Sequence, residues 1–115
     1  MSSEAQVPGL AKILPVWVLR SADSDGAHRF RLRSGAVKTL GRAPRADFIV
    51  DAPLVSRIHC RVTASDEHLD VVDLKSTNGT YVNDKRVRHG LLEPGDRLRL
   101  GRVELLVEKT NRGER

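Results

Sequence analysis

Ser76-Thr77-Asn78-Gly79-Thr80-Tyr81-Val82-Asn83 is the stretch that decides the fold of this chain. It begins with small polar residues, passes through Asn78-Gly79, a pair typical of tight turns, and enters a short strand at residues 80–82. Asn83-Asp84 comes next, and both residue types tolerate positive φ, so a tight hairpin is expected there. The stretch therefore predicts strands joined by turns, with Thr77 and Asn78 displayed at the crest of a loop.

Short strands are predicted along almost the whole of residues 13–109. Apolar or alternating runs cover 13–20, 28–33, 37–41, 47–50, 58–63, 69–74, 80–82, 86–87, 97–100 and 103–109. No window has the apolar periodicity of a helix, and turn signals recur roughly every 8–12 residues. This pattern predicts an all-β sandwich or barrel. Residues 1–12 are expected to form a flexible lead and residues 110–115 a flexible tail.

The composition is that of one small globular domain. The chain has 115 residues, 39% of them hydrophobic and 30% charged, which is enough to bury a core unaided. Aromatic residues make up only 3%, too few for a surface that stacks single-stranded nucleic acid. Cys60 is the only cysteine and is expected to be a small buried residue of a strand, which suits a reducing compartment. Since no signal peptide or transmembrane run is evident, the predicted location is the cytoplasm, with no membrane contact.

Part of the excess positive charge lies between residues 85 and 102. The net charge is +5, and this segment contains Lys85, Arg86, Arg88, Arg97, Arg99 and Arg102. A solvated face of a sheet explains such a segment simply. The functional alternatives are attraction of an acidic or phosphorylated partner and binding of nucleic acid. Binding of nucleic acid is not favoured, because no nucleic-acid recognition motif accompanies the charge.

Ser56-Arg57-Ile58-His59 is a second polar run at the start of a predicted strand. A turn at residues 51–53 precedes it, so Ser56 and Arg57 are expected in a loop. A guanidinium beside a hydroxyl suits a phosphate, because arginine provides charge and a fork of donors while serine provides a neutral donor.

A catalytic pairing of Ser56 with His59 is not favoured. Three residues apart in an extended chain, the two lie about 10 Å from each other, and no carboxylate is placed to orient the histidine. Bracing of the loops through hydrogen bonds to backbone is the preferred role of His59. We expect no catalytic residue, no metal site and no cofactor.

These motifs together resemble the forkhead-associated (FHA) domain family. The resemblance rests on Gly41-Arg42, Ser56 to His59, the run from Leu74 to Asn83, Gly95-Asp96 and Gly101, in the family's order and spacing. It covers about residues 16–107. Each motif alone is weak evidence for the family, whereas the complete set is strong evidence. Asp84 departs from the family, which often has glycine at that place in the hairpin.

The resemblance implies a fold, a function and a division of roles. The fold is a sandwich of two twisted, mostly antiparallel sheets with functional loops at one end, and the function is binding of phosphothreonine peptides. The partner would be a phosphothreonine-containing protein, the substrate of a Ser/Thr kinase, bound by a monomer. The implied ligand-contacting residues are Arg42, Ser56, Arg57, Thr77 and Asn78, and the implied loop-structuring residues are Gly41, His59 and Gly79.

A different function on the same fold stays open. The domain could bind a protein, or assemble with itself, through its sheet faces and without a phosphate. The sequence names neither the partner nor the kinase.

Overall fold

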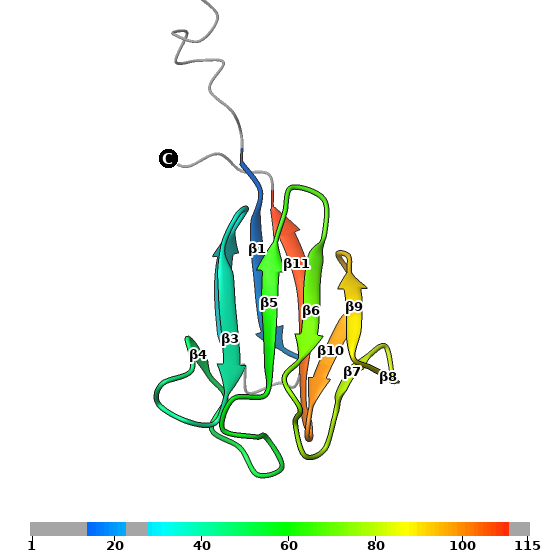
Figure 1. Ribbon diagram of the computed structural model, residues 1–115. Coiled ribbons are helices and arrows are strands. Elements are labelled where there is room, and N and C mark those ends of the chain that lie inside the picture. The colour runs from blue at the N-terminus through cyan, green and yellow to red at the C-terminus, as the bar shows by residue number, and fades with distance from the viewer. Residues whose placement is uncertain (1–13, 23–27, 111–115) are drawn as a thin grey trace, which may run out of the picture.

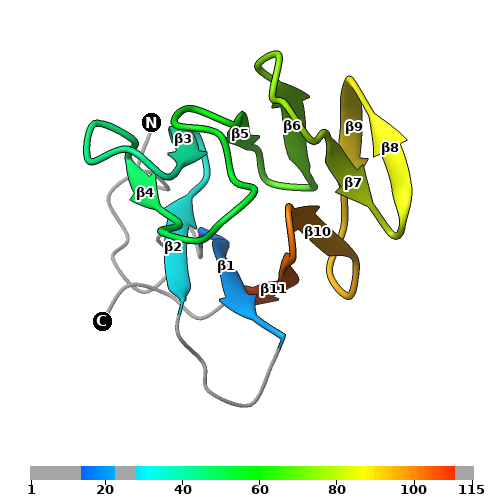
Figure 2. The same ribbon diagram turned by 90° about the horizontal axis from the view of Figure 1, so that it is seen from below.

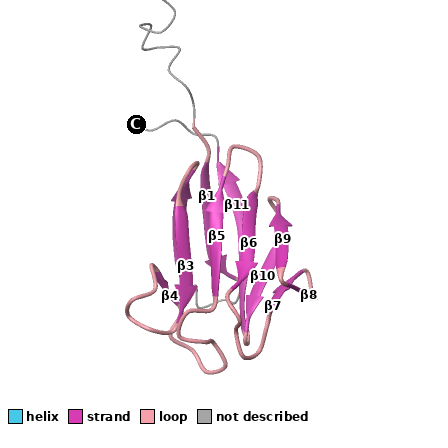
Figure 3. Cartoon of the chain, in the orientation of Figure 1, coloured by secondary structure: helices cyan, strands magenta, loops and turns pink. Residues whose placement is uncertain are grey.

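The structure, a computed structural model, describes residues 14–22 and 28–110. This part of the chain forms two β-sheets that pack face to face (Figures 1 and 2). Every element in it is a strand or a loop, as Figure 3 shows. The strands are β1 (Val16–Ser21), β2 (Arg29–Arg33), β3 (Val37–Gly41), β4 (Phe48–Ile49), β5 (Cys60–Ala64), β6 (Leu69–Asp73), β7 (Thr80–Val82), β8 (Lys85–Val87), β9 (His89–Leu92), β10 (Arg97–Leu100) and β11 (Val103–Thr110).

The sheets have six and five strands. The six-stranded sheet has the order β2-β1-β11-β10-β7-β8, and the five-stranded sheet has the order β4-β3-β5-β6-β9. Strands β3 and β4 pair in parallel, whereas the other described pairs are antiparallel. The predicted all-β sandwich of two mostly antiparallel sheets is confirmed.

The core is aliphatic and lies between the two sheets. Strand β1 contributes Trp17 and Leu19, both fully buried. The Trp17 indole nitrogen donates to the carbonyl of Ser65 (2.8 Å), which fastens the first strand to the β5–β6 loop. Each large aliphatic side chain buried here stabilises the fold by roughly 1.5–3 kcal/mol. The other fully buried aliphatic side chains include Leu40, Val62, Leu69, Val71, Leu92, Leu98, Leu100, Leu105 and Val107.

The β7–β8 hairpin has the predicted turn. Asn83 and Asp84 have φ of 49° and 71°, the two successive positive values of a turn whose twist matches antiparallel strands. The chain then changes sheets at Arg88, since β8 belongs to the six-stranded sheet and β9 to the five-stranded one.

Some predicted boundaries were wrong. Strand β9 was not expected, because Gly90 interrupts its apolar pattern, yet it pairs with β6 and closes one edge of the five-stranded sheet. Strand β5 begins at Cys60 rather than near Ile58. The expected lead at 1–12 lies outside the described residues, as does the expected tail at 110–115 except Thr110, the last residue of β11.

Candidate functional site

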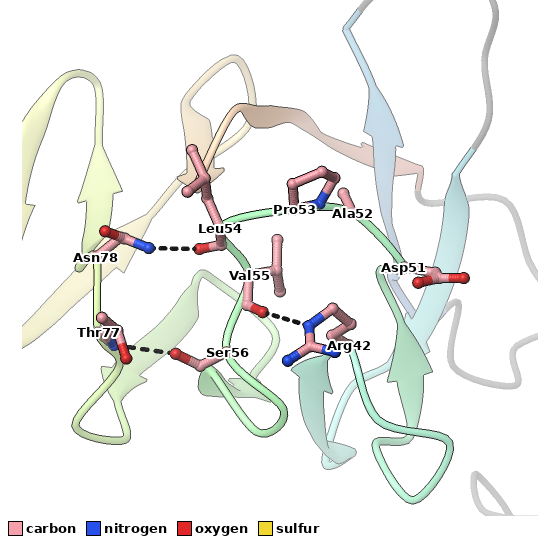
Figure 4. Close-up of a pocket in the computed structure, with 9 residues that line it drawn as sticks. All are labelled: Arg42, Asp51, Ala52, Pro53, Leu54, Val55, Ser56, Thr77 and Asn78. Carbon is pink, nitrogen blue, oxygen red and sulfur yellow. Dashed lines mark hydrogen bonds between the residues drawn. The ribbon is translucent and has the colours of Figure 1, made fainter.

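Several loops meet at one end of the sandwich, the lower end in Figure 1. They join β3 to β4, β4 to β5 and β6 to β7, and the tight β10–β11 turn lies beside them. At this turn, a Cβ on Gly101 would lie 3.0 Å from backbone of Leu54. Two adjoining depressions open between the loops, with volumes of about 540 and 880 Å³. The smaller one is shown in Figure 4 and is lined by Arg42, Asp51, Ala52, Pro53, Leu54, Val55, Ser56, Thr77 and Asn78.

Arg42 is anchored at one side of the smaller depression. Its Nε donates to the carbonyl of Val55 (3.0 Å), and its backbone N–H donates to the carbonyl of Ser56. Within the described residues, the two terminal amino groups of Arg42 have no protein partner. The guanidinium is therefore held in one orientation while two of its nitrogens can bind an anion.

Ser56 and Thr77 connect two loops and leave their hydroxyls available. The backbone N–H of Thr77 donates to the Ser56 hydroxyl oxygen (3.0 Å). Because that oxygen accepts this bond, the Ser56 hydroxyl proton can still donate to a ligand. The side chain of Thr77 is exposed. Asn78 makes a parallel link, with its Nδ2 donating to the carbonyl of Leu54 (3.0 Å), and its side-chain carbonyl remains an acceptor.

His59 lies fully buried beneath the same two loops. Its Nδ1 accepts from the backbone N–H of Ser56 (3.0 Å), and its Nε2 lies 2.8 Å from the carbonyl of Gly79. One partner can only donate and the other can only accept, so the ring is neutral with its proton on Nε2. Burial lowers the pKa of His59, and the Gly79 carbonyl and Asp73 only partly oppose this.

The separation of Ser56 from His59 expected for an extended chain does not apply, because the loop curls and brings the Ser56 backbone N–H to the imidazole. A catalytic pair is absent for a different reason. The Ser56 hydroxyl accepts a bond from Thr77, and the Ser56 contact with the imidazole is made by backbone. Both ring nitrogens of His59 are occupied, so neither can take a proton from the serine.

Gly41 and Gly79 lie where side chains would collide. A Cβ on Gly41 would stand 2.0 Å from the carbonyl oxygen of Arg57. Gly79 has φ of 92°, and a Cβ there would stand 2.6 Å from Nε of Arg86. The first close approach lets the β3–β4 and β4–β5 loops share backbone hydrogen bonds, among them Ala43 N–H to the Arg57 carbonyl.

Asp73, at the end of β6, organises the β6–β7 loop. Its carboxylate accepts from the backbone N–H of Ser76 (3.1 Å) and from the hydroxyls of Ser76 and Thr80. The Ser76 hydroxyl oxygen in turn accepts from the N–H of Gly79 (2.9 Å). Burial tends to raise the pKa of Asp73, but these hydrogen bonds outweigh it, and the pKa lies below its usual range.

Two non-glycine residues of these loops have strained backbone. Leu54 has φ of 73° and Lys75 has φ of 59°, in the left-handed region that costs such residues about 1–2 kcal/mol. Leu54 lines the smaller depression and Lys75 the larger one. The surrounding hydrogen bonds therefore impose a conformation that neither residue type prefers.

The larger depression is strongly positive. Its lining includes four cationic side chains and no carboxylate, whereas the smaller one has one cation and one carboxylate. The two depressions share Arg42, Ser56 and Thr77. The lining of the larger one is Arg42, Ala43, Pro44, Arg45, Ser56, Arg57, Ile58, Lys75 and Thr77.

The residues predicted from sequence come together at this end. Four of the five expected ligand-contacting residues line the smaller depression; the fifth, Arg57, lines only the larger one. Sequence reasoning missed Arg45 and Lys75 as neighbours of the site. Little in the sequence indicates their role, since each is a single cationic residue in a loop. The role of Asp73 in ordering the β6–β7 loop was also missed. Asp73 lies three residues before Ser76, a spacing at which an aspartate side chain often accepts a hydrogen bond from backbone.

The basic segment 85–102 does not form one free cationic surface. Arg97 forms ion pairs with Glu104 (3.3 Å) and Asp84 (3.5 Å). Arg99 covers the ring of Tyr81 (4.1 Å) and donates to the Gly101 carbonyl. These contacts favour a solvated sheet face over a nucleic-acid site.

Two further chemical findings concern the described residues. No group of three or more His, Cys, Asp or Glu side chains among them could hold a metal ion, and no helix there is long and apolar enough to cross a membrane. Cys60 is fully buried, as expected, and burial raises the pKa of its thiol far above the ordinary value.

The fold and the site define a class of protein: a β-sandwich whose loops form a cationic ligand-binding end. The FHA domain model matches residues 38–101, and the chain belongs to the FHA domain family. A solved FHA domain from a structural and functional study of phosphothreonine-dependent FHA interactions is 34% identical, with a TM-score of 0.71, covering 83% of this chain and 95% of that one. The FhaA FHA domain, solved in complex with the intracellular domain of Rv3910, is 33% identical with a TM-score of 0.70, covering 82% and 99%.

Two curated relatives are named for a regulatory or inhibitory role. The glycogen accumulation regulator GarA of Mycobacterium tuberculosis is 33% identical over 105 residues, 91% of this chain and 64% of GarA. The oxoglutarate dehydrogenase inhibitor of Corynebacterium jeikeium is 32% identical over 105 residues, 91% of this chain and 72% of the inhibitor. The chain thus spans just under two thirds of the length of GarA.

Proposed function

We propose that this domain binds proteins that carry a phosphothreonine, and that it does so without catalysis. One observation carries the proposal: the guanidinium of Arg42 and the hydroxyls of Ser56 and Thr77 line one depression. They are held there by hydrogen bonds that leave donors available. The solved relatives support it, since one comes from a study of phosphothreonine-dependent interactions and another was solved in complex with a protein domain.

Each residue has a definite role in this binding mode. A phosphothreonine brings nearly two negative charges and three acceptor oxygens. Arg42 provides the largest contribution, a charge-assisted contact worth roughly 1.5–3 kcal/mol. Ser56 and Thr77 each donate a neutral hydrogen bond worth about 1 kcal/mol. Asn78 accepts from the peptide backbone, and Arg57 adds charge from the neighbouring depression.

Gly41, His59 and Gly79 act on the loops rather than on the ligand. His59 links Ser56 to Gly79, and the missing side chain at Gly41 lets the first two loops touch. The same contacts leave no free base beside a nucleophile, which supports a binding module rather than an enzyme. A buried, unpaired Cys60 fits the reducing cytoplasm.

A direct titration tests the proposal. A short phosphothreonine peptide from a screened array is titrated against its unphosphorylated twin by calorimetry. We expect binding of the phosphorylated peptide alone, and Arg42→Ala should weaken it by about ten- to a hundredfold. Arg42→Lys keeps the charge but loses the fork and the Val55 contact, so it should recover only part of the affinity. Equal affinities for the two twins would instead favour an interaction through the sheet faces.

A further inference from the structure

We propose that the larger depression is a second anion-binding subsite, which takes another phosphorylated or acidic side chain of the same bound peptide. This inference rests on the proposed function and names its partner class more closely. The preferred partner is a segment that carries a second negative group within a few residues of the phosphothreonine.

The first step is the balance of charge. A phosphothreonine held by Arg42 supplies nearly two negative charges, but the larger depression has Arg45, Arg57 and Lys75 in addition to Arg42. Neither depression offers a carboxylate to these three cations except Asp51 in the smaller one. Within the described residues, none of the three forms an ion pair. Four cations against the nearly two negative charges of one phosphate leave about two positive charges uncompensated in the larger depression.

The second step is the placement of these cations. Each comes from a different loop: Arg45 from β3–β4, Arg57 from β4–β5 and Lys75 from β6–β7. The loops are fixed to one another, through Ala43 N–H to the Arg57 carbonyl and through Thr77 N–H to the Ser56 hydroxyl. Like charges held close together by backbone contacts are unfavourable until an anion neutralises them.

The third step is the conformation of Lys75. Its φ of 59° is one that glycine or asparagine adopts more easily. Asp73 and Ser76 impose this conformation on the loop, since the Ser76 N–H bonds the Asp73 carboxylate. A lysine at this place puts an exposed cation beside the larger depression despite the strain, as expected where ligand contact matters.

The two depressions are contiguous, so one peptide can occupy both. They share Arg42, Ser56 and Thr77, and the phosphothreonine would lie on these shared residues. One flank of the peptide would then cross the neutral depression, beside Leu54 and Pro53, and the other would cross the cationic one. Specificity is therefore expected to be asymmetric, with the second anion accepted on one side of the phosphothreonine.

The test uses one peptide backbone in several forms. The forms carry phosphothreonine alone, phosphothreonine with a phosphoserine at successive positions on either side, and phosphothreonine with aspartates at those positions. The unphosphorylated twin and a form with the second phosphate alone are the controls. We expect a second phosphate on one side to raise affinity about tenfold, aspartates to raise it less, and both gains to shrink at high salt.

Variants locate the effect. Arg45→Gln combined with Lys75→Gly removes two charges while keeping a residue at position 75 that tolerates its backbone. Arg31→Gln combined with Lys85→Gln removes the same charge from exposed side chains that line neither depression. The first pair should abolish the gain from the second anion and leave binding of the singly phosphorylated peptide within about twofold, whereas the matched pair should keep the gain. Thermal unfolding checks that both variants fold.

The outcomes separate this inference from the proposed function. If the singly phosphorylated peptide binds no better than its unphosphorylated twin, both proposals fail. If it binds, but a second phosphate or aspartates on either flank add nothing, the subsite alone is wrong. The subsite is also overturned if the gain survives loss of Arg45 and Lys75, or if the matched pair abolishes it equally, because net charge would then explain it.

Discussion

Gly41 is the residue at which the geometry of the site is most constrained. Its place beside the Arg57 carbonyl, with an added Cβ only 2.0 Å away, means that any side chain must push two loops apart. We expect Gly41→Ala to lower the free energy of unfolding by about 3 kcal/mol, the upper end for a forced overpacking. Phosphopeptide affinity should fall too, because Arg42 and Ser56 are hydrogen-bonded across that contact. Urea denaturation and peptide titration measure the two effects.

Gly35→Ala is the matched control for this change. Gly35 has φ of 94° but open space where a Cβ would stand, so the substitution adds backbone strain of about 1–2 kcal/mol without a collision. Its affinity for the phosphopeptide should be unchanged. A Gly41→Ala variant no less stable than Gly35→Ala would show that the loops can separate at little cost.

Some residues of the candidate site could be predicted from the sequence, and others could not. Ser56 beside Arg57 already indicated an anion site. The roles of Arg42 and Thr77 came from the resemblance to the FHA family, since an arginine after a turn glycine says little alone. Lys75 and Arg45 could not be predicted, since a loop cation says nothing about its neighbours until the fold brings three loops together. Only part of the role of His59 could be predicted from the sequence. Bracing of backbone was expected, but the curl that brings Ser56 to the ring depends on tertiary contacts.

At the scale of elements, the β6–β7 loop depends on one carboxylate. Asp73→Asn keeps the shape but removes the charge that strengthens the bonds from Ser76 and Thr80. Charge-assisted hydrogen bonds are worth about 1.5–3 kcal/mol, so we expect a loss of roughly 2 kcal/mol in unfolding free energy. Affinity for the phosphopeptide should fall as well, since this loop carries Thr77.

Asp70→Asn serves as the comparison on the same strand. Asp70 bonds the ring of His89, a contact whose histidine side chain is 62% exposed, and exposed pairs contribute little. This variant should change stability by less than about 1 kcal/mol and leave binding intact. If the two aspartate variants behaved alike, the assigned role of Asp73 in the loop would be wrong.

The β7–β8 hairpin can be stabilised by a substitution that lies outside the candidate binding site. Asp84 has φ of 71°, and glycine adopts this conformation without strain. Asp84→Gly also gives the Asn-Gly pair preferred by such turns. We expect a gain of about 0.5–1 kcal/mol, because the relief of roughly 1–2 kcal/mol of left-handed strain exceeds the entropic cost of a glycine in the unfolded chain. The lost Asp84–Arg97 pair spans 3.5 Å between exposed groups and is worth little. Thermal unfolding measures the gain, Asp84→Ala should show none, and phosphopeptide affinity should stay constant in both.

The elements that could be predicted are those with regular patterns. Alternation identified β2, with its arginines facing out, and the Asn83-Asp84 turn identified the hairpin. Strand β9 was not predicted, because a glycine and a histidine interrupt the apolar pattern of its four residues. Its pairing with β6 follows from a change of sheet, which no local sequence pattern encodes. The order of strands in each sheet likewise follows from packing of the whole core.

At the scale of the whole molecule, the sandwich separates stability from binding. The aliphatic core lies between the sheets, whereas Arg42, Ser56 and Thr77, the proposed ligand contacts, lie on loops beyond the strand ends. Only a few groups serve both purposes, among them His59 and Asp73, which are partly or fully buried and hydrogen-bond the loops. These groups titrate, so they couple the stability of the whole domain to pH.

The sign of this coupling follows from the lowered pKa of His59. In the unfolded chain, histidine binds a proton as pH falls below about 6.5. In the folded chain, burial keeps His59 neutral to lower pH, and protonation would break the bond from the Ser56 N–H. The unfolded state then binds more protons, so His59 stabilises the fold fully above pH 6.5, and this contribution is lost as pH falls through the folded pKa. The slope from one such group is at most about 1.4 kcal/mol per pH unit.

His59→Gln isolates this contribution. Glutamine can donate to the Gly79 carbonyl but does not titrate, so the variant is less stable at neutral pH and lacks the His59 share of the slope. We expect the stability difference between wild type and His59→Gln, from urea denaturation at a series of pH values, to be largest near neutral pH. The difference should narrow as pH falls below about 6.5, because only wild type then loses a neutral imidazole. Taking the difference cancels His28, His68 and His89, which both proteins retain. A constant difference across this range would show that His59 titrates alike in the folded and unfolded states, contrary to its buried bridge between the two loops.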